Sequence, residues 1–382
     1  MRTGLRIAAG FVWLLAGVHA AGAQAVAVQP SAVAAARAAR LGHGVNLTDW
    51  LRLLPNGRSF TKEQFDTAVT ADDLALIRAM GFDHVRLCVN PQPLFRPLQA
   101  DRIPSEPLAY VDASVRMILD AGLAVDLDIQ ADDAFKRRLA DDAFVEQFVD
   151  FWRALASHYA ALDPNRVFFE VLNEPELRDP YRWYGIEAKV VSAIRASAPQ
   201  HTIIVTGAHF SDEDDLIFLD PLRDANVIYA FHFYQPFLFT HQGATWSENF
   251  WHFLKGVPYP SNAEGAQQAA ALVPDPVHRL AVVRYGVSHW DAARVDLEIG
   301  QVAAWGARWG VPVLCNEFGV YRPDASARDR LAWLTDVRTA LEAHGIGWTT
   351  WEYSGGFGIV TKEAGQIVPD EPSLRALGLT RP

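Results

Sequence analysis

Two apolar, strand-like runs that each end abruptly in a glutamate constrain the fold of this chain more than any other feature. The first runs from Phe168 to Glu174 and the second from Val313 to Glu317. A buried strand has no reason to end on an acidic side chain unless that side chain lies at a rim. Because the carboxyl ends of parallel strands share one rim, we expect Glu174 and Glu317 to lie near each other.

Strand-like and helix-like segments alternate along the chain, which favours a parallel sheet covered by helices. Thr70 and Asp73 resemble a capping box ahead of an apolar stripe, and Gly81 ends that helix. The expected strands are 41–47, 83–89, 124–129, 166–172, 202–206, 227–233, 312–316 and 346–351. Further helices are expected at 108–121, 142–160, 183–197, 213–219, 294–309 and 326–343.

Eight strands with intervening helices predict the α/β class and a single (β/α)8 TIM barrel. A doubly wound open sheet is the alternative, but it would need a glycine-rich phosphate turn after the first strand, and the sequence has none. The 382 residues, half of them hydrophobic, suit one large core. We expect the catalytic domain to span 41–382, after an Ala-rich segment at 26–40 that forms a short helix or a linker.

The first 25 residues have the pattern of a signal peptide. Arg2 and Arg6 precede a short apolar stretch at 7–18, and small residues at 21–25 offer cleavage sites. An N-terminal membrane anchor is the alternative, but the stretch is short for a bilayer span. We therefore expect residues 1–25 to be removed and the mature protein to be secreted or periplasmic, with no membrane span.

The net charge limits the classes of partner, and the two cysteines raise the question of a disulfide. The net charge of −11 argues against nucleic acid, because phosphate binding needs a basic face. Export would permit a disulfide between Cys88 and Cys315, yet both lie in predicted strands far apart in barrel order, so we expect two free, buried thiols. We expect a monomer with no cofactor.

A long aromatic segment follows the sixth strand. About 60 residues separate Tyr234 from the helix at 294–309, and such long connections are usually functional. It should emerge at the carboxyl face of the barrel, where its aromatic rings could stack on sugars. Its aromatic residues are Phe237, Phe239, Trp246, Phe250, Trp251, Phe253 and Tyr259.

Two carboxylates at one barrel mouth are what glycoside hydrolysis requires. In the retaining reaction one carboxyl group protonates the leaving oxygen and the other, ionised, attacks the anomeric carbon, with the two about 5–5.5 Å apart. The alternative is that one of the two glutamates is only a salt-bridge partner at the rim. The sequence has no Gly-x-Ser-x-Gly elbow and no zinc-ligand spacing.

Five motifs in chain order resemble glycoside hydrolase family 5, the cellulase A family. They are Arg86, Leu172-Asn173-Glu174-Pro175, His232-Phe233-Tyr234, Asn316-Glu317-Phe318-Gly319 and Trp351. The resemblance covers nearly all of the mature chain. It implies a (β/α)8 fold and a retaining mechanism, with Glu174 as acid/base and Glu317 as nucleophile.

The resemblance also implies supporting roles. Asn173 would hydrogen-bond the sugar 2-hydroxyl, and Arg86 would hold the nucleophile ionised. Tyr234 would hydrogen-bond Glu317, and His232 would line the site. Trp351 would stack on a pyranose ring; from the residues alone, His232 and Trp351 could equally be core residues.

Four further positions are weaker candidates. Asn46 ends the first strand and binds substrate or serves a structural role, and Trp50 is a stacking candidate. Glu170 shares strand parity with Glu174, so we expect it to point inward and pair with Arg86. Gln130 stands where the family commonly has histidine, which could shift specificity because glutamine cannot titrate.

The leading hypothesis is an endo-acting, endoglucanase-like hydrolase of β-1,4-glucan. The same fold acting on mannan, xyloglucan, β-1,3-glucan or a bacterial exopolysaccharide stays open. An inactive glycan-binding protein and a metal-dependent barrel hydrolase are alternatives of other classes, although both glutamates and the lack of a ligand pattern argue against them.

Overall fold

The computed structural model describes residues 32–52, 60–96, 99, 101–246, 250–363 and 366–379. The expected signal peptide at 1–25 lies outside these residues. Within them, no helix combines the length and the apolar character needed to cross a bilayer.

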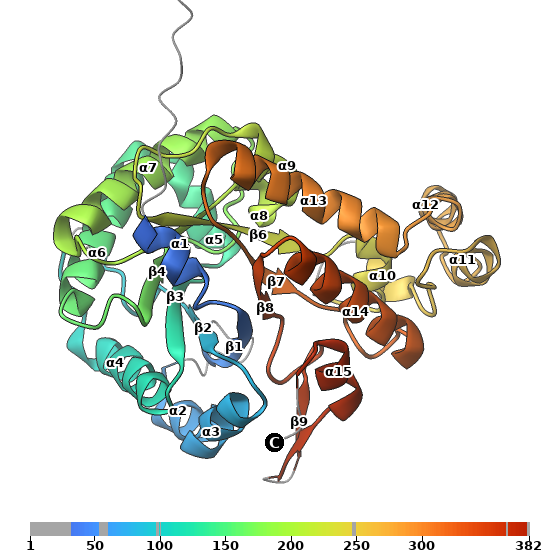
Figure 1. Ribbon diagram of the computed structural model, residues 1–382, viewed down its shortest axis with the longest axis horizontal. Coiled ribbons are helices and arrows are strands. Elements are labelled where there is room, and N and C mark those ends of the chain that lie inside the picture. The colour runs from blue at the N-terminus through green and yellow to red at the C-terminus, as the bar shows by residue number, and fades with distance from the viewer. Residues whose placement is uncertain are drawn as a thin grey trace, which may run out of the picture.

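Eight parallel strands form a closed barrel in sequence order, β1 to β8, with β8 pairing back to β1 (Figure 1). This confirms the (β/α)8 prediction and excludes the doubly wound sheet. The strands are β1 (His43–Leu51), β2 (His84–Val89), β3 (Ala124–Ile129), β4 (Val167–Glu170), β5 (Ile203–Thr206), β6 (Val227–Phe233), β7 (Val313–Phe318) and β8 (Gly347–Thr350).

Helices surround the barrel. They are α2 (Lys62–Ala68), α3 (Ala71–Ala79), α4 (Ser105–Asp120), α5 (Asp133–Arg137), α6 (Asp142–Tyr159), α7 (Pro180–Ser197), α8 (Ala208–Ser211), α9 (Glu213–Phe218), α13 (Ala292–Trp309) and α14 (Ala327–Ala343), with the 3-10 turn η1 (Arg138–Ala140). The capping box of Thr70 and Asp73 is confirmed at α3. A short hairpin, β9 (Val360–Glu363) and β10 (Gln366–Pro369), and α15 (Glu371–Ala376) end the described fold.

Three strands differ from the prediction by two or more residues at an end. The first is longer than 41–47 because it continues to Leu51 past an irregularity in its pairing with β2. The fourth is shorter than 166–172 and ends at Glu170, because the chain leaves the sheet before Glu174. The seventh extends to Phe318, so Glu317 lies within the strand and not after it.

The helix α1 (Ala32–Ala38) closes the amino-terminal end of the barrel, as Figure 1 shows. An apolar layer fills the barrel floor beneath it, and Ala38 packs against this layer. Arg37 fixes α1 by donating hydrogen bonds to the Gln200 carbonyl and the Thr202 hydroxyl. The floor residues are Leu41, Ala124, Phe168, Ile204, Ile228, Ala230 and Leu314.

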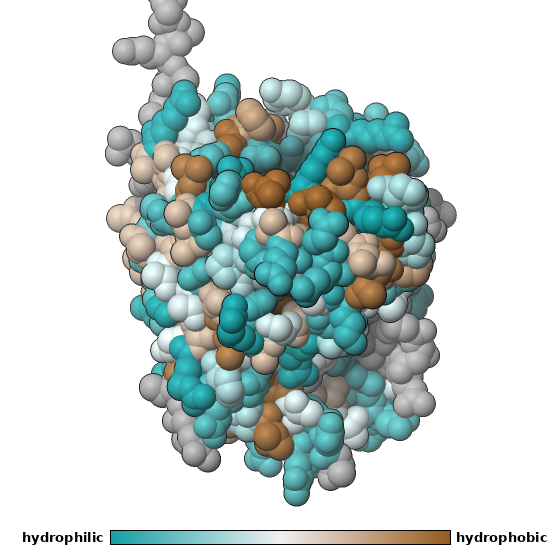
Figure 2. Space-filling view, turned by 90° about the vertical axis from the view of Figure 1, so that its right-hand side faces the viewer, coloured by the Kyte–Doolittle hydropathy of each residue, from teal (hydrophilic) through white to brown (hydrophobic). Residues whose placement is uncertain are grey.

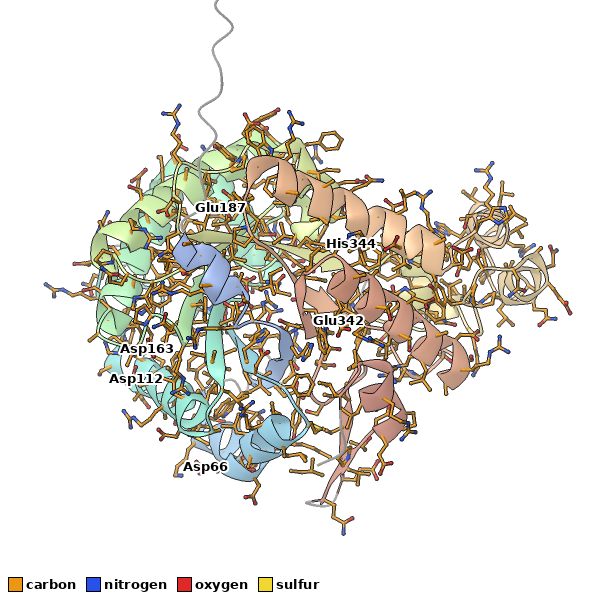
Figure 3. The ribbon with its side chains drawn as sticks, viewed as in Figure 1. Asp66, Asp112, Asp163, Glu187, Glu342 and His344 are labelled. Atoms are coloured by element: carbon orange, nitrogen blue, oxygen red, sulfur yellow. The ribbon has the colours of Figure 1, made fainter. Side chains whose placement is uncertain are left out.

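The helix ring is joined by polar contacts of its own. Asp112 of α4 accepts a 2.9 Å hydrogen bond from the Tyr159 hydroxyl of α6. Glu187 of α7 is buried and accepts a 2.9 Å bond from the Thr206 amide at the end of β5. Figure 3 labels Asp112 and Glu187, and both belong to the ring outside the strands. Cys88 and Cys315 are both free and buried, as expected.

The segment after β6 folds into helices, not into an open loop. It contains α10 (Phe237–Thr240), the 3-10 turn η2 (Phe250–Phe253), α11 (Ala263–Ala270) and α12 (Pro276–Tyr285). The α11–α12 pair lies to one side of the barrel (Figure 1). Figure 2 views this side, where apolar side chains lie scattered among polar ones, and Val277 and Leu280 of α12 are among the exposed residues.

Candidate active site

A single guanidinium organises the upper part of the barrel interior. Arg86 on β2 is fully buried and donates from Nη1 to Glu317 Oε1 at 2.6 Å. Its other edge donates to Glu170, from Nε to Oε2 at 2.6 Å and from Nη2 to Oε1 at 2.7 Å. The expected inward pairing of Glu170 with Arg86 is therefore confirmed. This bidentate contact fixes the plane in which Arg86 meets Glu317.

Glu317 is held at both carboxylate oxygens. Oε1 accepts from Arg86, and Oε2 accepts a 2.9 Å bond from the Tyr234 hydroxyl at the end of β6. Burial raises the pKa of Glu317, and the positive charges of His232 and Arg86 offset only part of this effect. The carboxylate is thus fixed in one orientation by two donors from different strands.

The chain around Glu317 requires a glycine two residues later. A side-chain carbon at Gly319 would lie 2.3 Å from the Trp351 carbonyl oxygen, which is too close for any other residue. The strands β7 and β8 therefore approach closely where Glu317 and Trp351 meet the mouth. This accounts physically for the glycine of the Asn-Glu-Phe-Gly motif.

Glu174 faces the same mouth from the turn after β4. Its φ is +47°, a left-handed conformation that costs energy for a residue with a side chain. Its Oε1 lies 3.1 Å from His232 Nδ1, and Nδ1 is 3.5 Å from Glu317 Oε2. Ligand atoms of Glu174, His232 and Glu317 all lie within 4.8 Å of one another. The two carboxyl groups are close enough for one sugar carbon to lie between them.

The two carboxyl groups have opposite pKa shifts. Burial raises the pKa of Glu174, but the hydrogen bond and charge of His232, together with the charges of Lys136 and Arg86, outweigh burial and bring the pKa to about 2. The pKa of Glu317 is raised. His232 therefore influences the proton affinity of both groups.

The other predicted site residues fall into two sets. Asn173 and Asn46 are buried and accept from Arg86 at 2.8 and 3.0 Å, and Asn46 Nδ2 also donates to the carbonyls of Asn316 and Thr350. Asn46 thus supports Arg86. Trp351 and Gln130 are half-buried at the ends of β8 and β3, and the buried Oε1 of Gln130 has no hydrogen-bond partner among the residues that the structure describes.

Trp50 is wrong as a stacking candidate. It is fully buried, stacks on Phe65 at 5.4 Å and donates from its indole nitrogen to the Phe65 carbonyl. Most aromatic residues of the 235–291 segment also pack internally, as Phe237 does on Trp251. Trp246 is the exception at the mouth: it is 57% exposed and contacts Tyr321 and Phe357.

Phe210 is a site candidate that sequence reasoning missed. His209, Phe210 and Ser211 all have positive φ, and the Phe210 amide donates to the carbonyl of Pro175, the residue after Glu174. Phe210 is 53% exposed. Backbone strain of this kind concentrates at functional sites. The turn thus carries an exposed aromatic ring, and its backbone is hydrogen-bonded to the residue after Glu174.

Comparison with known proteins agrees with this geometry. Residues 55–356 match the family model described as cellulase (glycosyl hydrolase family 5). Endoglucanase C of Acetivibrio thermocellus is 29% identical over 317 residues, which cover 81% of this chain and 90% of that protein.

Solved structures share the fold. The Thermotoga maritima Cel5A structure in complex with mannotriose substrate has a TM-score of 0.73 at 24% identity, covering 90% of this chain and 99% of that one. The cellulose synthase subunit Z of Clostridioides difficile has a TM-score of 0.70 at 24% identity, covering 88% and 99%.

Proposed function

Because the chain belongs to glycosyl hydrolase family 5, a family of β-glycoside hydrolases, we propose that it cleaves β-1,4-glucosidic bonds in a polysaccharide with net retention. The observation that carries this proposal is the placement of Glu174, His232 and Glu317, whose ligand atoms lie within 4.8 Å of one another. Inverting enzymes keep their carboxyl groups roughly 6.5–9.5 Å apart to admit a water molecule.

In the first step Glu317 attacks the anomeric carbon. A new bond forms from a Glu317 oxygen to this carbon as the glycosidic C–O bond breaks and its electron pair goes to the leaving oxygen. Arg86 and Tyr234 orient the attacking carboxylate and favour its ionised form, which opposes the effect of burial on its pKa. The leaving oxygen takes its proton from Glu174.

Glu174 must therefore hold a proton when the sugar is bound. His232 favours the ionised form of Glu174 in the free enzyme. A sugar ring that fills the mouth excludes water, and desolvation favours the neutral acid, so Glu174 takes up its proton on binding. In the second step Glu174 removes a proton from water, which attacks the anomeric carbon and releases Glu317.

Several features support a glucan chain as the substrate. Endoglucanase C, a relative that this chain matches over 90% of its length, is named for action on a glucan. Trp351, at the end of β8, is half-buried, and Phe210 and Trp246 are exposed aromatic side chains, as sugar stacking requires. Mannan is the second candidate, because a fold neighbour was solved with mannotriose, and a bacterial exopolysaccharide is a third, because another neighbour is a cellulose synthase subunit.

The test distinguishes the roles of Glu174 and Glu317 by using a substrate whose leaving group needs no proton. An aryl β-cellobioside with a strongly acidic phenol needs no proton donor, so Glu174→Ala should still release phenol rapidly and accept azide as the second nucleophile. Glu317→Gln should lose both this reaction and glucan hydrolysis by several orders of magnitude. Glu187→Gln, a buried carboxyl change in the helix ring, is the control. Near wild-type turnover by Glu317→Gln would defeat the assignment.

Product analysis tests the rest. We expect the β-anomer to appear first by NMR, and soluble β-1,4-glucan to be cleaved faster than mannan, xyloglucan or β-1,3-glucan. Binding without turnover on every glycan would instead support a glycan-binding protein. Because Glu174, His232 and Glu317 could also hold a cation, loss of activity in a chelator would support a metal-dependent hydrolase.

Export and oligomeric state are further parts of the proposal. Amino-terminal sequencing of protein recovered outside the cytoplasm should begin after residue 21 to 25 if the segment at 1–25 is a signal peptide. Light scattering of the mature protein should give the mass of a monomer.

A further inference from the structure

Four carboxyl groups surround one guanidinium in the barrel interior. Asp126 and Asp128 on β3, Glu170 on β4 and Glu317 on β7 are all buried near Arg86. Asp126 is paired in register with Arg86, and Asp128 with Glu170. Aliphatic side chains usually fill this layer of a barrel, so the concentration of acids needs a physical explanation.

All N–H donors of Arg86 are hydrogen-bonded to residues other than the two aspartates. A guanidinium has five N–H groups. Two go to Glu170, one to Glu317, one to Asn46 and one to Asn173. Asp128 Oδ2 lies 3.2 Å from Arg86 Nη2, but no N–H is left for it. The hydrogen-bonded anions of Arg86 are thus Glu170 and Glu317.

Neither aspartate finds a donor elsewhere. All four side-chain oxygens of Asp126 and Asp128 are buried and accept no hydrogen bond from the described part of the chain. An ionised carboxylate in this state would be very costly, and such groups keep their proton instead. Burial, followed by the charge of Glu170, raises the pKa of Asp126 well above its ordinary value.

A proton on Asp126 has an acceptor close by. Asp126 on β3 pairs with Phe168 on β4, so Glu170, two residues further along β4, is its diagonal neighbour. The interaction between the two carboxyl groups raises the pKa of Asp126 and lowers that of Glu170. Glu170 in turn fixes the guanidinium that orients Glu317. The chain of contacts runs from Asp126 through Glu170 and Arg86 to Glu317.

We propose that Asp126 is a positioning residue, a neutral carboxylic acid whose O–H donates to Glu170 and so holds Arg86 against Glu317, and that Asp128 is also neutral. Its kinetic consequence rests on the proposed role of Glu317 as nucleophile. Arg86 then neutralises two anions instead of four, and the charge beneath Glu317 stays close to balanced.

The experiment compares two replacements of Asp126. Asp126→Asn is neutral, nearly isosteric and still offers an N–H to Glu170, so kcat should stay within about threefold of wild type. Asp126→Val has a similar size and no donor, so kcat should fall by about tenfold or more with little change in KM. Glu187→Gln is the matched control for loss of a buried carboxyl group.

The acidic limb of the pH profile of kcat/KM gives a second kinetic readout. If Asp126 is neutral, Asp126→Asn leaves this limb where it is. If Asp126 is ionised, its replacement removes a negative charge near Glu317, lowers the pKa of Glu317 and moves the limb to lower pH. Such a shift, or a kcat for Asp126→Asn as low as for Asp126→Val, overturns the proposal.

Infrared difference spectra make the test independent of activity. At neutral pH, wild type minus Asp126→Asn should show the C=O stretch of a protonated carboxyl group, and a carboxylate band in its place overturns the proposal. If the infrared result holds while Glu317→Gln stays active, the proton assignment survives and the proposed function fails. A chain with Asp126→Asn that cannot fold also overturns the proposal, because a neutral isostere should preserve the contact.

Discussion

Arg86 and Glu317 are joined by a 2.6 Å hydrogen bond between Nη1 and Oε1, and neither side chain is free to turn away from the other. Glu170 and two asparagines occupy the remaining donors of Arg86, and the Tyr234 hydroxyl occupies the second oxygen of Glu317. The barrel therefore fixes this pair from several strands at once, and the predictions below follow from which of these contacts is removed.

Arg86→Lys should nearly abolish turnover and destabilise the fold. Lysine cannot supply a planar fork, so Glu170 and the asparagines would lose donors inside the barrel. A buried acceptor that is left without its donor costs about 1–3 kcal/mol, and more when the acceptor is charged. We expect kcat to fall by at least about 100-fold, together with a lower Tm by calorimetry. Unchanged values of both would contradict the network.

Tyr234→Phe should lower kcat without a large loss of stability. The change removes only the hydroxyl that donates to Glu317 Oε2, a hydrogen bond to a charged group worth about 1.5–3 kcal/mol. We expect kcat to fall by about 10- to 100-fold. Tyr184→Phe is the control, because within the described residues its hydroxyl donates only to the Pro221 carbonyl, at 3.4 Å. Equal effects of the two changes would argue against a specific role for Tyr234.

His232→Leu should raise the pKa of Glu174. In the wild type the His232 contact, with the charges of Lys136 and Arg86, outweighs burial and brings that pKa to about 2. Without the imidazole, burial dominates and the neutral acid persists to higher pH. Carbon-13 NMR titration of labelled glutamate, with Glu174→Gln for assignment, measures the shift. A Glu174 pKa that stays near 2 would show that another group lowers it.

Glu352→Gln should stabilise the protein above neutral pH. Burial raises the pKa of Glu352 to about 7, although Thr48 donates to its carboxyl group. Since the folded pKa lies above the unfolded one, the stabilisation is complete below the unfolded pKa and is lost as pH rises to about 7. The loss is roughly 3 kcal/mol at most. Thermal unfolding from pH 4 to 9 should show this decline in the wild type and a weaker decline in Glu352→Gln.

Phe210→Ala should weaken the binding of long substrates. The ring is exposed on a turn whose backbone is hydrogen-bonded to Pro175, the residue after Glu174, and we expect it to stack on a sugar ring past the cleaved bond. We expect KM for a soluble glucan to rise by roughly five- to tenfold, while hydrolysis of a short aryl glycoside changes little. Phe218→Ala, which removes a similarly exposed ring at the end of α9, is the control. A rise in KM for both variants would mean that exposure alone explains the effect.

The sequence predicted the barrel and the inward residues of its strands well, because both depend on local pattern. Alternation along the strand indicates that Glu170 points inward, and this sufficed to pair Glu170 with Arg86, although Glu174 lies beyond the end of that strand. Parallel strands put Glu174, His232 and Glu317 at one rim for the same reason.

The missed features depend on packing or on unusual backbone conformations. The prediction that Trp50 stacks on a sugar is wrong because Trp50 packs on Phe65 of α2. Composition does not show which side of a strand faces a helix. The aromatic residues after Tyr234 looked available for substrate, but most of them form the core of an inserted helical segment. The sequence His209-Phe210-Ser211 contains no feature that predicts three successive residues with left-handed backbone conformation.

The position of α1 has a consequence for exchange with water. With that helix and the apolar floor closing one end of the barrel, the mouth offers the natural route by which solvent could reach Arg86 and the acids around it. A saccharide that occupies the mouth would then isolate these groups during each catalytic cycle. Any hydrogen they carry should exchange with deuterium slowly in the resting enzyme and more slowly still when a tight-binding inhibitor is present.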